Sequence, residues 1–226
     1  MQSVWSASIA TIVALAILIS LGVWQLHRRA WKHAILADIT RAEQSPPIPL
    51  TGTPPRFTKV VARGVWRPAV ALYGVDVRES EDGRSHLGAQ RLQILTRDGA
   101  APLLVDQGWV PTEGAAPAPA QGPASVEGYV RAPDHPGLLS PDDDLASRHF
   151  YTLDPAAIGI ALGASDAAPF TLIALGQATP GGPIPSQNLP RPPDNHLQYA
   201  FTWFGLAAAL ASVFAVWVTR KRVEPT

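Results

Sequence analysis

Two long uncharged runs, one near each end of the sequence, constrain this chain more than any other feature. Val4 to Leu26 and Leu197 to Thr219 each comprise 23 residues without a charged side chain. At a rise of about 1.5 Å per residue, such a helix reaches roughly 34 Å and can cross a hydrocarbon layer about 30 Å thick. Trp and Tyr residues lie near the ends of both runs, as expected at headgroup level. The sequence therefore predicts transmembrane helices at 4–26 and 197–219, which flank residues 27–196 and leave a tail at 220–226.

The first run could also be read as a secretory signal peptide. Its flanks argue against that reading, because no Lys or Arg precedes the run and Trp24-Gln25-Leu26 is not a small-residue cleavage site. We expect an uncleaved membrane anchor.

Basic residues at the ends of the runs bear on orientation. The basic run 220–222 directly follows the second span, and the positive-inside rule then places the C-terminus in the cytoplasm. With two spans, both termini lie on that side and residues 27–196 lie in the periplasm or its equivalent. Arg28, Arg29 and Lys32 would then lie on the outer side, where they could meet an anionic partner such as acidic lipid headgroups.

The segment between the spans has the pattern of a β-rich domain. Residues 27–43 have apolar side chains at helical spacing and continue the first helix, until a run of prolines ends it. The predicted strands are 59–66, 69–77, 90–96, 103–110, 125–131, 150–153 and 170–174. The first two are expected to pair around Arg67-Pro68, and the next two around the turn Arg97-Asp98-Gly99.

A short helix at 155–162 is predicted late in this domain, with Asp154 as its N-cap and Gly163 as its stop. Residues 114–123 and 179–193 are rich in Pro and Gly and are expected to be extended loops. The predicted class is membrane α+β: two transmembrane helices flanking a periplasmic, antiparallel β-rich sheet or open barrel with one or two short helices.

Composition excludes several functions. The chain has 18 basic and 18 acidic residues, so its formal net charge is zero and no nucleic-acid footprint is expected. It has no cysteine, which excludes disulfides and thiolate metal sites.

Familiar catalytic motifs are also absent from the sequence, and three weaker candidates remain in the loop domain. His86, His135 and His149 are scattered and could form a metal site only if the fold gathered them. The run 142–144 is acidic but lacks the ligand spacing of a calcium loop, and Ser85 or Ser147 as a nucleophile would lack an oriented acid. Solvated loop residues are the favoured interpretation, and no enzyme is expected.

His196 stands where the second apolar run begins, and a histidine at that position raises the question of function. Asp194 or Asn195 can cap the helix, so that His196, Tyr199, Ala200 and Trp203 share one face of it. One nitrogen ligand, a small gap and two aromatic walls would suit a haem with one axial imidazole. An ordinary belt of interfacial aromatic residues explains the same pattern, and both interpretations stay open on these grounds.

Two further surfaces of the spans have recognisable patterns. Ser20, Trp24 and His27 share a face of the first helix that ends at the same depth as His196. On the second helix, small residues at 205 and 209, and at 208 and 212, could form a packing face for a partner helix.

Four segments match one known family in order and spacing. They are LGVWQLHRRAWK at 21–32, VVARGVW at 60–66, LLVDQGWVP at 103–111 and NHLQYAFTWF at 195–204. Together they resemble the surfeit-locus-one family of cytochrome c oxidase assembly proteins over nearly the whole chain.

The resemblance implies a non-enzymatic assembly factor in the bacterial inner membrane, which binds haem a near the outer face and assists its insertion into the oxidase catalytic subunit. It implies that His196 is the axial ligand of the haem iron, and we expect Tyr199, Trp203 and Arg28 to contact the haem. Partners would be that subunit and membrane lipids, with the haem a synthase as a further candidate. The alternative is a scaffold that stabilises the nascent subunit without binding haem. The chain departs from the family pattern at Gln107, where Arg is usual, which puts any salt bridge there in doubt.

Overall fold

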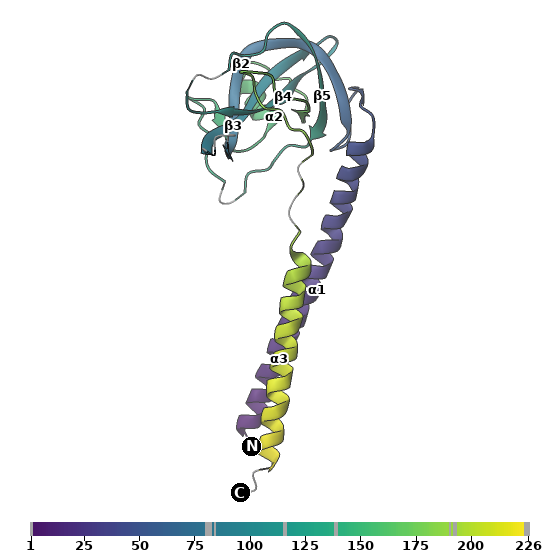
Figure 1. The fold of residues 1–226 in the computed structure, drawn as a ribbon, viewed down its shortest axis with the longest axis vertical. Helices are drawn as coiled ribbons and strands as arrows, with labels where there is room; N and C mark the ends of the chain where they lie inside the picture. Colours follow the sequence, from purple (N-terminus) through teal and green to yellow (C-terminus); the bar gives the residue numbers. More distant parts are fainter. Residues whose placement is uncertain are drawn as a thin grey trace. The chain divides into compact units, whose positions relative to one another are not determined.

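The computed structural model describes residues 2–79, 83, 85–114, 117–137, 140–189, 191 and 194–223. The chain divides into two compact units. The first comprises Met1–Asp38 with Arg191–Thr226, and the second comprises Ile39–Pro190. Figure 1 shows two long helices in the first unit and a curved sheet with a short helix in the second.

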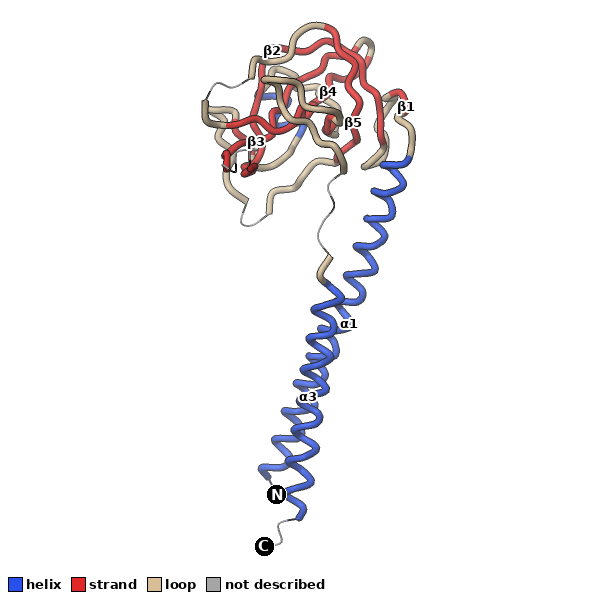
Figure 2. The backbone as a smooth tube through the Cα atoms, viewed as in Figure 1, coloured by secondary structure: helices blue, strands red, loops and turns tan. Residues whose placement is uncertain are grey.

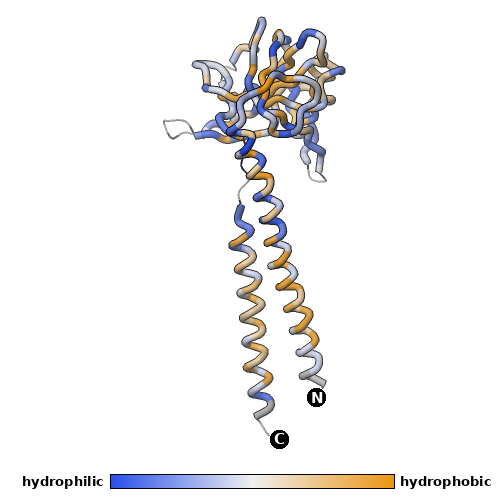
Figure 3. The backbone as a smooth tube through the Cα atoms, turned by 90° about the vertical axis from the view of Figure 1, so that its right-hand side faces the viewer, coloured by the Kyte–Doolittle hydropathy of each residue, from blue (hydrophilic) through white to orange (hydrophobic). Residues whose placement is uncertain are grey.

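The first unit contains most of α1, Gln2–Gln44, whose end from Ile39 onward belongs to the second unit, and the whole of α3, His196–Val223. Both are long and apolar enough to cross a membrane, over Trp5–Gln44 and His196–Lys221 (Figure 3). Many of their large apolar side chains are exposed, as a lipid-facing surface requires. The two predicted helices are therefore confirmed, as is the continuation of the first through residues 27–43.

The strands of the second unit pair in a closed circuit (Figure 2). The circuit runs through β2 (Lys59–Glu79), β3 (Ser85–Arg97), β4 (Ala100–Pro111), β7 (Thr171–Ala174) and β5 (Pro123–Arg131), and returns to β2. All of these pairs are antiparallel except β4–β7, which is parallel. Two short strands, β1 (Ile48–Pro49) and β6 (His149–Phe150), pair with β2 in parallel. The predicted β-rich domain is confirmed, but its sheet is mixed rather than wholly antiparallel, and the β2–β5 pairing closes the barrel in place of the expected open barrel or sheet.

The prediction of a strand pair around Arg67-Pro68 is wrong. Both segments belong to the single strand β2, whose first part pairs with β5 and whose second part pairs with β3. An irregularity between Trp66 and Val70 absorbs the proline, which lacks an N–H but tolerates extended backbone. The Gln93 side chain donates to Arg67 O at 2.6 Å, so the carbonyl at this bend remains paired.

The predicted hairpin turn, short helix and helix stop of this unit are confirmed, whereas the strand predicted at 150–153 is only the two-residue β6. The loops predicted at 114–123 and 179–193 lie partly outside the described residues. Strands β3 and β4 form a hairpin whose loop is Asp98-Gly99, with Gly99 at a φ of 64°. The short helix α2 spans Pro155–Ala161, and the Asp154 side chain caps it by accepting from Ala156 N at 2.9 Å. Gly163 follows at a φ of 75°, which favours glycine and ends the helix.

The barrel core is apolar. It is formed by Val60, Ala62, Leu95, Leu103, Val105, Val130, Ala168, Phe170 and Leu172. Residues 102–110 of β4 are buried without alternation, so this strand is covered on both faces.

A bulge in β4 places Gln107, the residue at which the chain departs from the pattern of the family that it resembles. Arg91 pairs with Gly108 and Leu92 pairs with Asp106, which leaves Gln107 as the extra residue. Gly108 donates its N–H to Asp106 Oδ1 at 2.9 Å, so the donor displaced by the bulge stays satisfied. The buried Gln107 side chain accepts from Arg91 Nε at 2.7 Å. Arg91 therefore supplies a cation beside position 107.

The polar side chains beneath this bulge also hold a loop in place. Arg91 Nη1 donates to Pro117 O and Ala118 O, both at 3.0 Å. Gln93 donates to Ala120 O at 2.8 Å and accepts from Ala120 N at 3.2 Å. The loop after β4 is thus fastened to the outside of β3 by buried side chains rather than by strand pairing.

Candidate functional site

The candidate site lies in the first unit, where α1 and the start of α3 run side by side (Figures 1 and 3). Positions 22, 25, 29 and 33 of α1 fall at helical spacing along one stripe. Gly22 lies against the Phe204 ring, with so little space that a Cβ at this position would lie 2.6 Å from it. The other three positions carry polar side chains that contact residues 194–196. An apolar contact within the span and polar contacts at the end of it that is next to residues 194–196 thus join the two helices.

His196 is the first residue of α3 and is half-buried. Its Nδ1 lies 2.7 Å from Oε1 of Gln25. An amide oxygen can only accept a hydrogen bond, so Nδ1 carries the proton and the lone pair of the neutral ring is on Nε2. Among the described residues, Nε2 has no hydrogen-bond partner. The ring is therefore held by one nitrogen and offers the other as a ligand.

Asp194 organises the beginning of α3. Its Oδ1 accepts from His196 N at 3.3 Å, and its Oδ2 lies 2.8 Å from His33 Nε2 and 4.0 Å from Arg29 Nε. Desolvation acts to raise the pKa of Asp194, but the hydrogen bonds from His196 and His33 outweigh it and hold that pKa below its usual range. The expected cap is confirmed, and its carboxylate also binds two side chains of α1.

The residues predicted to surround a haem differ in their exposure. Ala200 is buried and Trp203 is half-buried, whereas Tyr199 is 54% exposed. The indole N–H of Trp203 is buried and has no acceptor among the described residues. Arg28 is exposed, and its guanidinium lies over the Trp31 ring at 3.9 Å. Among the described residues of α3 in the predicted set, His196 alone makes a side-chain hydrogen bond to α1, and its partner is Gln25.

Sequence reasoning missed Gln25 and His33 as contacts of the α3 start. The predicted face of Ser20, Trp24 and His27 is instead exposed. The signal that could have found the correct face was the spacing of polar residues at 25, 29 and 33, four apart along one helix. The small residues at 205, 208, 209 and 212 are exposed, so they are not packed against any other part of the chain that the structure describes.

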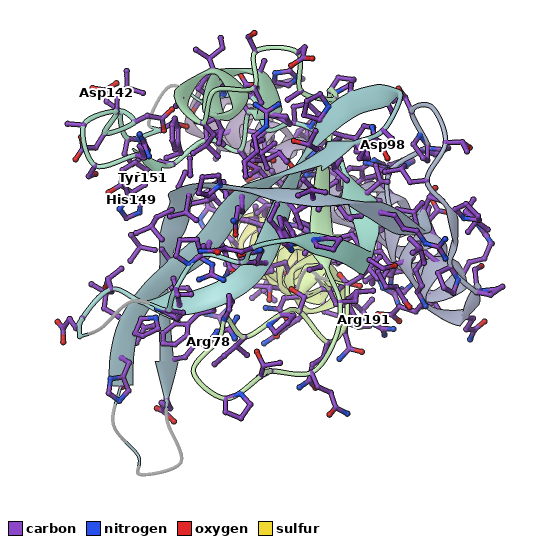
Figure 4. All side chains as sticks on the ribbon, turned by 90° about the horizontal axis from the view of Figure 1, so that it is seen from above. Arg78, Asp98, Asp142, His149, Tyr151 and Arg191 are labelled. Carbon is purple, nitrogen blue, oxygen red and sulfur yellow. The ribbon has the colours of Figure 1, made fainter. Side chains whose placement is uncertain are left out.

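Four of the scattered candidates of the second unit, His149, Asp143, Asp144 and Ser147, make structural contacts. His149 lies 2.7 Å from Gly74 O through Nε2 and stacks on Tyr151 (Figure 4). Asp143 accepts from Tyr151 N at 2.6 Å, and Ser147 Oγ donates to Asp144 at 2.7 Å. The bonds from Ser147 hold the pKa of Asp144 below its usual range. No group of three potential metal-ligating side chains occurs in the part of the chain that the structure describes.

A cavity of about 310 Å³, with both polar and apolar lining, opens among the barrel strands. Its lining includes Tyr73, Asp106, Tyr129 and Arg131. Arg131 Nη2 contacts Asp134 Oδ2 at 2.8 Å and Tyr73 OH at 3.2 Å, so its charge is already balanced. Asp106 is only 4% exposed, and burial raises its pKa to about 6 despite the Gly108 N–H bond.

This buried carboxyl makes the stability of the barrel depend on pH. In the folded barrel the pKa of Asp106 lies above its ordinary value of 3.8. The protonated carboxyl therefore stabilises the fold fully below about pH 3.8, and this stabilisation is lost as the pH rises through about 6. Two pKa units correspond to about 3 kcal/mol. Asp106→Asn keeps the acceptor for Gly108 N without the charge. We expect denaturant unfolding to show the variant more stable than wild type at about pH 8, with the difference much reduced at about pH 4. An equal difference at both pH values would contradict this origin.

Comparison with known proteins finds sequence relatives over most of the chain. The sequence profile described as the SURF1 family matches residues 12–208. Surfeit locus protein 1 of Takifugu rubripes is 29% identical over 226 residues, which cover 90% of this chain and 93% of that protein. The protein of the same name from Mus musculus is 31% identical over 211 residues, covering 84% and 68%. A SURF1-like protein of the bacterium Rickettsia conorii is 26% identical over 219 residues, covering 92% and 89%. With its two apolar helices, the chain is a membrane protein. The family match spans both helices and the barrel between them, and the chain belongs to the SURF1 family.

Proposed function

We propose that this protein is an assembly factor for cytochrome c oxidase that carries haem a at the outer edge of the membrane and delivers it to the oxidase catalytic subunit. The resemblance of its four motifs to an oxidase-assembly family supports the role in assembly. The observation that supports haem binding is the orientation of His196, whose Nδ1 is engaged by Gln25 while Nε2 keeps its lone pair. A neutral imidazole held in this way fits the axial position of a haem iron.

The neighbouring residues fit the rest of a haem in chemical terms. Arg28 lies in the outer part of α1, and the stacking of its guanidinium on Trp31 uses the face of the group rather than its in-plane N–H donors. These donors suit a propionate. Tyr199 and Trp203 offer aromatic surface within two turns of His196. A single imidazole ligand suits a carrier, because the haem must also be released. We propose a carrier rather than an enzyme, with the haem a synthase as the candidate donor.

We also propose that both termini lie in the cytoplasm and that the barrel lies in the periplasm. The basic residues after α3 support this orientation. The chain lacks cysteine, so single cysteines report topology cleanly. In cells with a permeabilised outer membrane, Ser85→Cys on β3 should react with a membrane-impermeant maleimide, whereas Thr226→Cys should react only after lysis. The reverse pattern would contradict the orientation.

A complementation experiment tests the proposed function. A strain lacking the gene should lose most oxidase activity and most of the haem a in its oxidase, and wild type should restore both. His196→Ala should fail to restore either, because the ligand nitrogen is gone. The matched control is His27→Ala, which removes an exposed histidine at the outer part of α1 and should complement fully. Full complementation by His196→Ala, at equal protein level, would contradict the proposed ligand.

An apolar patch on the barrel favours the second candidate, a scaffold for the nascent oxidase subunit. Val75, Val77 and Leu87 are 56%, 58% and 43% exposed, and Val77 pairs directly with Leu87 across β2 and β3. The three side chains therefore lie on one face of the ribbon. If this surface stabilises the subunit, Val77→Ser with Leu87→Ser should lower oxidase assembly, whereas Ile160→Ser on the exposed side of α2 should not. Normal assembly with the double variant would remove the support for the scaffold.

A further inference from the structure

The side chain of Gln25 is the one described group that fixes the ring of His196. The contact joins two helices that are 171 residues apart in sequence, and it uses the amide oxygen rather than the amide nitrogen. An unconstrained neutral imidazole favours the proton on Nε2, which would leave the wrong nitrogen protonated for a ligand that binds through Nε2. The acceptor at Nδ1 reverses that preference.

The position of Gln25 is itself fixed by its neighbours. Three residues before it, Gly22 lets Phe204 approach α1, and four residues after it, Arg29 lies near Asp194. Asp194 in turn caps the helix that His196 begins. The Gln25 amide therefore lies between the apolar contact of Gly22 with Phe204 and the polar contact of Arg29 with Asp194, level with the His196 ring.

We propose that Gln25 is a positioning residue that fixes His196 as the Nδ1–H tautomer and keeps Nε2 a moderately weak ligand, so that haem can be bound and released. The proposal rests on the proposed function for the identity of the ligand, but the tautomer is a property of the unloaded protein.

The strength of His196 as a metal ligand depends on whether residue 25 carries an amide or a carboxylate. A carboxylate that accepts from the distal N–H raises the basicity of a metal-binding imidazole and strengthens its bond to the metal. A neutral amide orients the ring equally well without adding a charge. Glutamine at position 25 thus favours a bond that can be broken during delivery, whereas glutamate would favour retention.

The tautomer can be measured without haem. Nitrogen-15 spectra of the full chain in nanodiscs, with the His196 signals assigned by their loss in His196→Ala, should show Nδ1 protonated and Nε2 unprotonated at a pH where the ring is neutral. Gln25→Leu should shift His196 towards the Nε2–H form. Gln198→Leu makes the same change at an exposed position of α3 and should leave the spectrum as in wild type. An Nε2–H ring in wild type, or an unchanged tautomer in Gln25→Leu, would overturn the proposal.

The ligand strength is measured on the haem-loaded protein. Gln25→Leu should bind haem a at least about 10-fold more weakly than wild type, in the range seen when such supporting partners are removed. Gln25→Glu at mildly alkaline pH should bind more tightly, release haem to apomyoglobin more slowly and raise the iron–histidine stretching frequency. Equal or faster release from Gln25→Glu would overturn the claim about strength. If wild type binds no haem while its His196 is the Nδ1–H tautomer, the proposed function fails and the role of Gln25 in orienting the ring stands.

Discussion

Gly108→Ala is expected to destabilise the barrel by about 4 kcal/mol, which is a large part of the stability of a domain of this size. Gly108 has a φ of 112°, and a Cβ built there would lie 2.1 Å from Ile184 O. That oxygen accepts from Trp109 N at 2.9 Å, and Ile184 N donates to Trp109 O at 2.8 Å. Alanine would therefore strain β4 and push away the segment that covers it. Thermal unfolding followed by tryptophan fluorescence should show the loss.

Gly99→Ala separates backbone strain from the steric clash. Gly99 also has a positive φ, 64°, but nothing lies within 4 Å of the place where its Cβ would be. The expected decrease in the free energy of unfolding is about 1 kcal/mol, and it comes from backbone strain alone. Equal losses for the two variants would show that the contact between Gly108 and Ile184 contributes nothing.

Gln107→Arg is expected to lower the free energy of unfolding by about 3 kcal/mol. This variant introduces the residue that the family resemblance implies at position 107. Gln107 is 8% exposed and accepts from Arg91 Nε at 2.7 Å. Arginine has no acceptor, so the change would leave two cations together in a buried place. Burial already lowers the pKa of Arg91. Denaturant unfolding of the full chain in detergent should show the reduced midpoint.

Two further variants test whether the pairing itself is responsible. Gln107→Glu keeps an acceptor and adds a charge opposite to that of Arg91, so its free energy of unfolding should stay close to that of wild type. The exchange Arg91→Gln with Gln107→Arg should recover most of the loss, to within about 1 kcal/mol of wild type. If the exchange is as unstable as Gln107→Arg alone, Arg91 does not compensate for the departure at position 107.

The membrane helices and most strands could be predicted because their signals are local. An uncharged run of sufficient length has few alternatives to a helix that crosses the membrane. The turn at Asp98-Gly99 and the cap at Asp154 depend on single residues whose conformational preferences are strong. In each case the neighbouring sequence contained the whole physical cause.

Strand β2 was mispredicted because its course depends on partners far along the chain. Arg67-Pro68 has the composition of a turn, yet pairing with β5 before it and with β3 after it keeps the backbone extended. The parallel pairing of β4 with β7 joins segments more than 60 residues apart and likewise has no local signal. Tertiary pairing therefore overrides local preference at these places.

The candidate site was predicted in part. The cost of placing an imidazole at the beginning of an apolar helix marked His196, and the Asx cap marked Asp194. The partner of the ring could not be deduced, because which face of α1 meets α3 depends on the approach of Phe204 to Gly22 rather than on the most apolar or aromatic surface. Gln25 became visible only once the two helices were placed together.

The central claim is that His196 holds haem a, and the absorption spectrum of the purified protein tests it most directly. Wild type isolated from cells that make haem a should carry the haem a Soret and α bands, and His196→Ala isolated in parallel should lose them, while His27→Ala keeps them. Equal haem in wild type and His196→Ala would contradict the claim. Haem-free wild type from cells whose oxidase depends on it would contradict the carrier role and leave the scaffold.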